Sequence, residues 1–104
     1  EIVMEETYIV VRTKGHQEFR GEPERVREWV EERFVEKTGL FVYLQEDFED
    51  GEFELYLHSS FYDDADEETI EKLENMGISD DPETTKAIEK ILGVKFFVEE
   101  IIFV

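Results

Sequence analysis

The fold is decided by residues 40–57, which read LFVYLQEDFEDGEFELYL. Aliphatic residues alternate with aromatic or polar residues through 40–45, and Phe53, Leu55 and Leu57 alternate with Glu54, Tyr56 and His58. This is the period of a strand. Between the two runs lies an acidic segment that ends in Asp50-Gly51, a dipeptide typical of tight hairpin turns. The stretch therefore predicts two antiparallel strands joined by a hairpin.

The flanking sequence predicts helices and two more strands. Pro23 suits a first helical position, apolar residues recur at helical spacing after it, and Gly39 supplies the stop. We expect further elements in this order: a strand over 2–13, a loop over 14–22, short helices ending at Gly77 and Gly93, and a strand over 94–104. The order β-α-β-β-α-α-β predicts one α+β domain over 1–104 with the ferredoxin-like split β-α-β arrangement. In it, a four-stranded antiparallel sheet carries helices on one face.

In that arrangement the first and last strands are neighbours. Pairing residues whose numbers sum to 105 sets apolar against apolar almost throughout, for example Ile9 against Phe96. The exceptions are two carboxylate pairs, which call for a bulge, water or a cation: Glu5 with Glu100 and Glu6 with Glu99. Beyond them the strand ends would be apolar on both faces. We therefore expect this end of the sheet to pack on a second chain or a partner, unless the strands curl over their own helices.

The charge is concentrated in the middle of the chain. Residues 45–83 hold sixteen Asp and Glu against the single base Lys72, so they carry −15 of the net −18. Such a field repels nucleic acid and anionic membranes and attracts basic protein surfaces. We expect a protein partner with a basic surface or a homodimer, no direct nucleic-acid binding and no membrane binding. The composition suits a soluble and heat-stable protein, cytoplasmic if it is natural, or a designed one.

Catalytic and metal-binding motifs are missing from the sequence. There is no cysteine, so thiol chemistry and zinc–thiolate sites are excluded. The EF-hand template fails, because placing Gly51 at its glycine position puts Phe48 and Leu57 at ligand positions. We predict no metal and no cofactor. His16 in a loop and His58 on a strand are the candidates if the protein is an enzyme.

The sheet face turned away from the helices is the candidate binding surface. If the leucines of the hairpin point inward, Phe41, Tyr43, Tyr56 and His58 point outward, and one phase of the first strand adds Tyr8 and Arg12. Aromatic residues on an exposed sheet can stack on RNA bases, but the net charge opposes this use. The same residue types are enriched at protein interfaces.

The sequence therefore predicts a small acidic interaction protein without catalytic activity. It would self-associate or bind a basic partner, and its sharpest form is a nucleic-acid mimic or inhibitor. The alternatives are a de novo designed or idealised scaffold, because local signals agree with one fold, and a small enzyme using His16 or His58. The predicted partner-binding residues are Tyr8, Arg12, Phe41, Tyr43, Tyr56, His58, Asp63, Asp64, Glu67 and Glu68.

Overall fold

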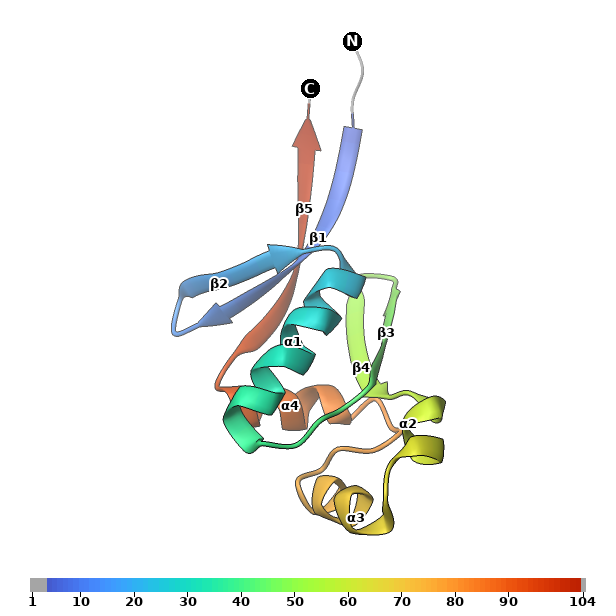
Figure 1. Cartoon of the computed structure of the whole chain (residues 1–104). Helices are drawn as coiled ribbons and strands as arrows, with labels where there is room; N and C mark the ends of the chain where they lie inside the picture. The colour runs from blue at the N-terminus through green and yellow to red at the C-terminus, as the bar shows by residue number, and fades with distance from the viewer. Residues whose placement is uncertain (1–3, 104) are drawn as a thin grey trace.

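The structure is a computed structural model that describes residues 4–103 of the chain (Figure 1). The described residues form five strands and four helices, which confirms the predicted α+β class. The strands are β1 (Met4–Thr13), β2 (His16–Gly21), β3 (Leu44–Glu49), β4 (Glu52–Leu57) and β5 (Lys95–Phe103). The helices are α1 (Pro23–Thr38), α2 (Ser59–Asp64), α3 (Glu67–Asn75) and α4 (Thr84–Leu92). The expected Ile2, Val3 and Val104 positions lie outside the described residues.

The strands form two antiparallel sheets and not the single four-stranded ferredoxin-like sheet that we expected. One sheet has the order β2-β1-β5 and the other is the β3-β4 hairpin. The predicted loop over 14–22 was wrong, because Lys14 (φ 45°) and Gly15 (φ 83°) form a two-residue turn that starts β2. Both positive φ values match the right-handed twist of a hairpin. Strand β2 then occupies the edge of β1 that a ferredoxin-like sheet would offer to β4.

Strand β4 finds other partners for the backbone groups on its outer edge. The Thr85 hydroxyl accepts a hydrogen bond from the Leu55 N–H (2.6 Å) and donates to the Leu55 carbonyl (3.3 Å). The Leu57 N–H donates to the Ser79 carbonyl at 2.8 Å. The first turn of α4 and the connection before it thus satisfy groups that a neighbouring strand would otherwise bond. The two sheets touch through Phe53 and Phe96, whose rings meet edge to face at 5.5 Å.

The register of β1 and β5 is shifted by two residues from the predicted one. Paired residue numbers sum to 107, so Ile9 faces Val98. The predicted carboxylate pairs are therefore wrong: Glu5 and Glu6 face Ile102 and Ile101, while Glu99 and Glu100 face Tyr8 and Thr7. The shift separates the like charges, and because side chains alternate with period two it leaves every residue on its predicted face.

The core lies between the helices and the inner faces of the two sheets. Helix α1 contributes the fully buried Val26, Val30 and Phe34 along one side. The hairpin contributes its inward leucines, and α3 and α4 contribute Leu73 and Ile88. Helix α1 begins at Pro23 and ends at Thr38, and Gly39 caps it in the left-handed conformation (φ 74°), as predicted. None of the helices in the described part of the chain is long and apolar enough to cross a membrane.

Candidate functional site

The outer face of the β3–β4 hairpin presents the side chains that the sequence placed there. The register pairs Leu44 with Leu57 and Gln45 with Tyr56, so the leucines are buried and Tyr56 faces outward. Tyr43 precedes β3 and lies opposite His58, whose N–H donates to the Tyr43 carbonyl at 2.8 Å. The predicted outward phase is confirmed for Gln45 and Tyr56. The expected strand over 40–43 was wrong, because β3 begins only at Leu44 and Phe41 and Tyr43 lie in the segment before it.

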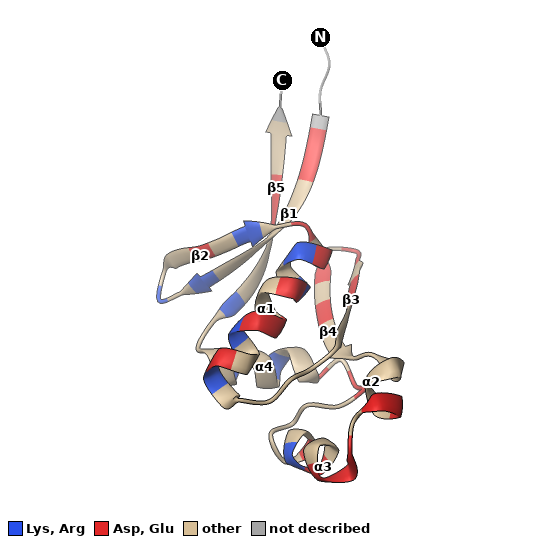
Figure 2. Cartoon of the chain, viewed as in Figure 1, with Lys and Arg blue, Asp and Glu red and all other residues tan. Residues whose placement is uncertain are grey.

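The other end of the same face is entirely acidic. The register sets Asp47 directly opposite Glu54 and Glu49 directly opposite Glu52, with Asp50 in the turn. These five carboxylate residues line a hollow of 240 Å³. Figure 2 shows acidic positions in red along both strands of the hairpin. None of the five lining residues forms an ion pair with a cation among the described residues. We call these five residues the acidic tip.

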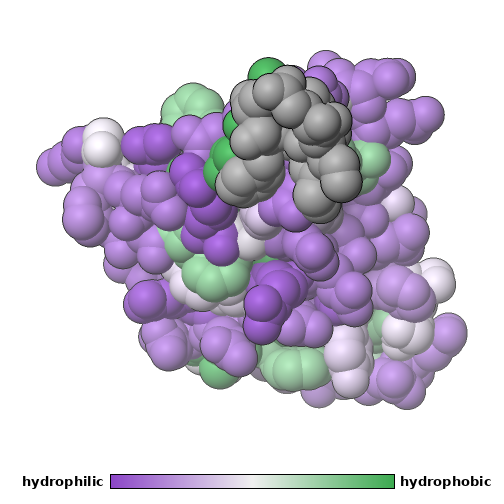
Figure 3. All heavy atoms as spheres, turned by 90° about the horizontal axis from the view of Figure 1, so that it is seen from above, coloured by the Kyte–Doolittle hydropathy of each residue, from purple (hydrophilic) through white to green (hydrophobic). Residues whose placement is uncertain are grey.

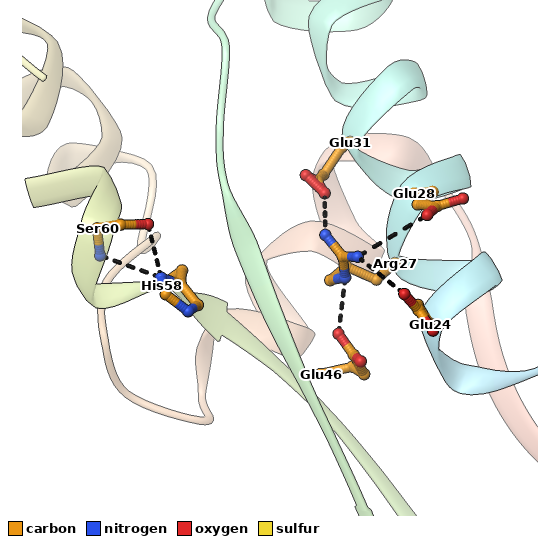
Figure 4. A network of polar contacts seen from close by, with 7 residues as sticks. All are labelled: Glu24, Arg27, Glu28, Glu31, Glu46, His58 and Ser60. Atoms are coloured by element: carbon orange, nitrogen blue, oxygen red, sulfur yellow. Dashed lines mark hydrogen bonds and ion pairs between the residues drawn. The ribbon is translucent and has the colours of Figure 1, made fainter. Parts of the chain in front are cut away.

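On the inner side of the hairpin, unlike at the acidic tip, the carboxylate forms an ion pair. Arg27 of α1 places Nε 2.7 Å from a Glu46 oxygen and one terminal nitrogen 2.8 Å from a Glu31 oxygen (Figure 4). Its other terminal nitrogen lies 3.9 Å from Glu28 and 4.0 Å from Glu24. The Arg27 side chain is only 20% exposed, so its pairs with the shielded Glu31 and Glu46 are screened little by solvent, while Glu24 and Glu28 are exposed. The fold therefore neutralises the carboxylates that face α1 and leaves the acidic tip without counter-charge.

Glu31 is the most perturbed carboxyl of this network. Burial raises its pKa above the ordinary value of 4.5, although the Arg27 guanidinium and a hydrogen bond from the Leu44 backbone both lower it. Because the pKa of Glu31 is raised overall, desolvation of its carboxyl outweighs the attraction of the Arg27 guanidinium. The Arg27 network thus holds a half-buried charge in place between α1 and β3.

Neither histidine lies in a catalytic arrangement within the described residues. His58 caps α2: its Nδ1 accepts from the Ser60 N–H at 3.0 Å and lies 2.7 Å from the Ser60 hydroxyl (Figure 4). His16 is exposed at the start of β2, paired with Thr13. No hydrogen bond joins either ring to a carboxylate in the described part of the chain. The enzymatic alternative stays a prediction.

Phe41 and Tyr43 lie beside a second hollow. Their rings meet edge to face at 5.0 Å, and both are exposed, Phe41 by 56% and Tyr43 by 45%. They line a cavity of 340 Å³ together with residues of α2, the α2–α3 connection and the start of α3. Asp64, which the sequence predicted as a site residue on grounds of charge alone, lines the same cavity.

Tyr8 and Arg12 do not join this surface. They lie on the outer face of β1, in the other sheet, so their predicted place beside Tyr56 and His58 was wrong. The Arg20 guanidinium lies 5.9 Å from the Tyr8 ring centre, and Arg12 lies 3.7 Å from Glu99, which also pairs with Arg20. A hydrogen bond to Glu6 raises the pKa of Tyr8. These side chains form an ionic cluster on the outer face of the β2-β1-β5 sheet, in which Arg12 and Arg20 lie beside Glu99.

The remaining predicted acids lie around the α2–α3 connection. Asp63 and Asp64 end α2, and Glu67 and Glu68 occupy the first turn of α3, where negative charge suits the helix dipole. Asp66 caps α3 by accepting from the Thr69 N–H at 2.7 Å, and hydrogen bonds from Thr69 lower its pKa. Glu68 lies 3.3 Å from Lys72, so this group is partly compensated.

Sequence reasoning did not single out the residues of the acidic tip. The signal was present, because Asp47 and Glu49 alternate with Phe48 while Glu52 and Glu54 alternate with Phe53 around an Asp-Gly turn. Applying strand alternation through the turn would have put all four carboxylates on the outer face. The described residues contain no group of three or more His, Cys, Asp or Glu placed to hold a metal ion.

Comparison with protein-family models, with curated proteins and with solved structures gave no match to this chain.

Proposed function

We propose that this chain is a small acidic interaction protein without catalytic activity, which binds a basic protein surface through the outer face of the β3–β4 hairpin. One observation supports this above the others: the acidic tip sets Asp47 against Glu54 and Glu49 against Glu52, with no cation beside them in the described residues. Like charges directly opposite each other on neighbouring strands destabilise a sheet. A surface that is costly to the fold is understandable if a cationic partner compensates it.

The contrast with Arg27 strengthens this argument. The fold supplies a counter-ion to Glu46 on the inner side of β3, yet it supplies none one residue away at Asp47 on the outer side. An idealised scaffold would place opposite charges across the strands, because every local choice would then agree with the fold. The uncompensated tip therefore favours a binding surface over the designed-scaffold alternative.

A nucleic-acid mimic is a more specific version of the same proposal. Two adjacent rows of carboxylates on the hairpin would stand in for phosphates, and the partner would be a protein that binds nucleic acid. Electrostatic contacts of this kind make affinity strongly dependent on salt, because counter-ions are released on binding.

The first test neutralises the tip with Asp47→Asn, Glu49→Gln, Glu52→Gln and Glu54→Gln together. We expect labelled oligolysine to bind the variant at least about tenfold more weakly at low salt, because four exposed charge contacts are removed. We also expect the free energy of unfolding to rise by about 1 kcal/mol, because two repulsive cross-strand pairs disappear. Fluorescence anisotropy and chemical denaturation measure the two quantities.

The matched control removes the same charge elsewhere, with Asp63→Asn, Asp64→Asn, Glu67→Gln and Glu68→Gln. If the tip is the binding surface, this variant loses much less affinity for oligolysine than the tip variant does. Equal losses would show that oligolysine responds to net charge alone, and the proposal would fail.

A second candidate activity is self-association through the outer part of β1 and β5. Strand β2 pairs only with residues 9–13 of β1, so the part of β1 before Ile9 has no neighbour on that edge among the described residues. This two-stranded ribbon extends away from the helices (Figure 1). Phe97 (50% exposed) and Ile102 (60% exposed) lie on opposite faces of β5. Seen from above, most of the surface is hydrophilic and hydrophobic side chains form small separate patches (Figure 3).

We expect the chain to form a homodimer that Phe97→Ser and Ile102→Ser together convert to a monomer. Ile102 lies in the ribbon, and Phe97, which faces Val10, lies on the adjoining three-stranded part of the same sheet. Replacing both removes exposed apolar area of β5 that a second copy would bury. Light scattering after size exclusion gives the mass of each species. Val35→Ser with Met76→Ser, which removes two exposed apolar residues elsewhere, should leave the mass unchanged. A monomeric parent at every protein concentration would refute self-association.

A further inference from the structure

The cavity beside Phe41 and Tyr43 is an apolar hollow with a charged rim, and we call it the aromatic groove. Its apolar lining includes Leu40, Phe41, Tyr43 and the buried Phe61 of α2. Asp64 and Asp66 stand at its α2–α3 side. No basic side chain lines it.

Phe41 also lines a neighbouring apolar hollow of 370 Å³. That hollow runs along α1 beside the exposed Val35, and three glutamates line it: Glu31, Glu32 and Glu36. Glu31 and Glu36 pair with Arg27 and Arg33, while Glu32 has no ion pair among the described residues. Phe41 is therefore common to two apolar hollows, and carboxylates line both of them.

The two rings contribute little to the folded core. Buried and partly buried apolar residues pack together around α1 and the hairpin, and neither Phe41 nor Tyr43 is among those that pack against this cluster. Leaving two aromatic rings in water costs solvation free energy that a binding partner would recover. Because they lie outside the core, their removal tests binding without unfolding the chain.

We propose that the aromatic groove binds a basic amphipathic peptide segment, whose apolar side chains enter the hollows while its Lys or Arg residues meet the carboxylate rim. The charge of the rim selects this occupant: aromatic faces and carboxylates both attract Lys and Arg. A second copy of this chain would bring −18 of like charge to an acidic rim. Nucleic acid would be repelled in the same way. The inference rests on the proposed function and names the chemistry of its partner.

The test compares two labelled peptides with equal numbers of lysines, one with leucines interspersed at helical spacing and one of lysine with glycine. The parent should bind the Leu/Lys peptide more tightly, because only this peptide can fill the hollows. Phe41→Ser with Tyr43→Ser should weaken the Leu/Lys peptide by at least about tenfold and leave the Gly/Lys peptide unchanged. Met76→Ser, an exposed apolar residue outside the groove, is the matched control and should change neither affinity.

The peptide measurements distinguish failure of the groove proposal from failure of the proposed function. If the Phe41/Tyr43 variant binds the Leu/Lys peptide as tightly as the parent does, the groove proposal is overturned, while weaker binding by the acidic-tip variant would still support the proposed function. If neither peptide binds the parent, both proposals are overturned. If light scattering shows that the parent is a dimer and the Phe41/Tyr43 variant a monomer, with no preference for the Leu/Lys peptide, the groove belongs to a second copy and the peptide proposal is overturned.

Discussion

Replacing Arg27 by Met should lower the free energy of unfolding by about 3 kcal/mol at pH 7, in the range seen when one partner of a buried ion pair is removed. Met fills much of the volume of the Arg stem, so the loss comes from charge and not from a cavity. Glu31 and Glu46 have side chains only 14% and 27% exposed, and both would lose their closest cation. Chemical denaturation of parent and variant measures the difference.

The pH dependence of this loss identifies its cause. Burial already raises the pKa of Glu31 above 4.5, and Arg27 is the first influence opposing that rise. Without Arg27 the folded state binds a proton on Glu31 more readily than the unfolded chain does. Stability then falls as pH rises through the window between 4.5 and the raised pKa, and it recovers as pH falls through that window. The deficit of the variant relative to the parent should therefore be largest at neutral pH and shrink toward pH 4.5.

Two further variants separate charge from packing. Arg25→Met removes an exposed cation from the same helix that has no ion pair within the described residues, and it should cost less than about 0.5 kcal/mol. Arg27→Met combined with Glu31→Gln should be more stable than Arg27→Met alone, because an amide costs less to bury than an unpaired carboxylate. An Arg27 variant as stable as the parent at every pH would show that the network contributes nothing to folding.

The class of fold could be predicted from the sequence, but the sheet topology could not. Helix α1 carries a Pro start, a Gly stop and a regular apolar face, and the β3–β4 hairpin carries alternation around Asp50-Gly51, so both were predictable. Strand β2 has a single large apolar residue, Phe19, and no alternation to identify it. Its pairing depends on the positive φ values of Lys14 and Gly15, for which Lys-Gly is a weak signal.

The candidate binding surface was likewise predictable only where it depends on local sequence, and not where it depends on how distant segments pair. Tyr56 could be placed on the outer face, because strand period alone determines it. Tyr43 and His58 lie just outside the strands, where the period no longer applies. That Tyr8 and Arg12 belong to another sheet depends on β2, which the sequence did not reveal. The role of His58 as a helix cap depends on α2, whose six residues are too few to give a clear apolar period.

Replacing Thr85 by Val should lower the free energy of unfolding by about 2 kcal/mol, because it leaves two buried backbone groups without partners. Leu55 is fully buried, and its N–H and carbonyl both bond the Thr85 hydroxyl in place of a neighbouring strand. Val has the shape of Thr, so packing is retained while both hydrogen bonds are lost. Chemical denaturation gives the size of the effect, and hydrogen exchange should show faster exchange of the Leu55 amide.

The control variants test whether the Thr85 hydroxyl, and not another part of the side chain, satisfies the backbone groups on the outer edge of β4. Thr85→Ser keeps the hydroxyl and should retain most of the stability and the slow exchange at Leu55. Thr7→Val makes the same isosteric change on β1, where the side chain has no hydrogen bond among the described residues, and should cost almost nothing. If Thr85→Val were as stable as Thr7→Val, the hydroxyl would not be what satisfies β4. The separation of the two sheets would then follow from β2 alone, since β2 already occupies the edge of β1 that β4 would need.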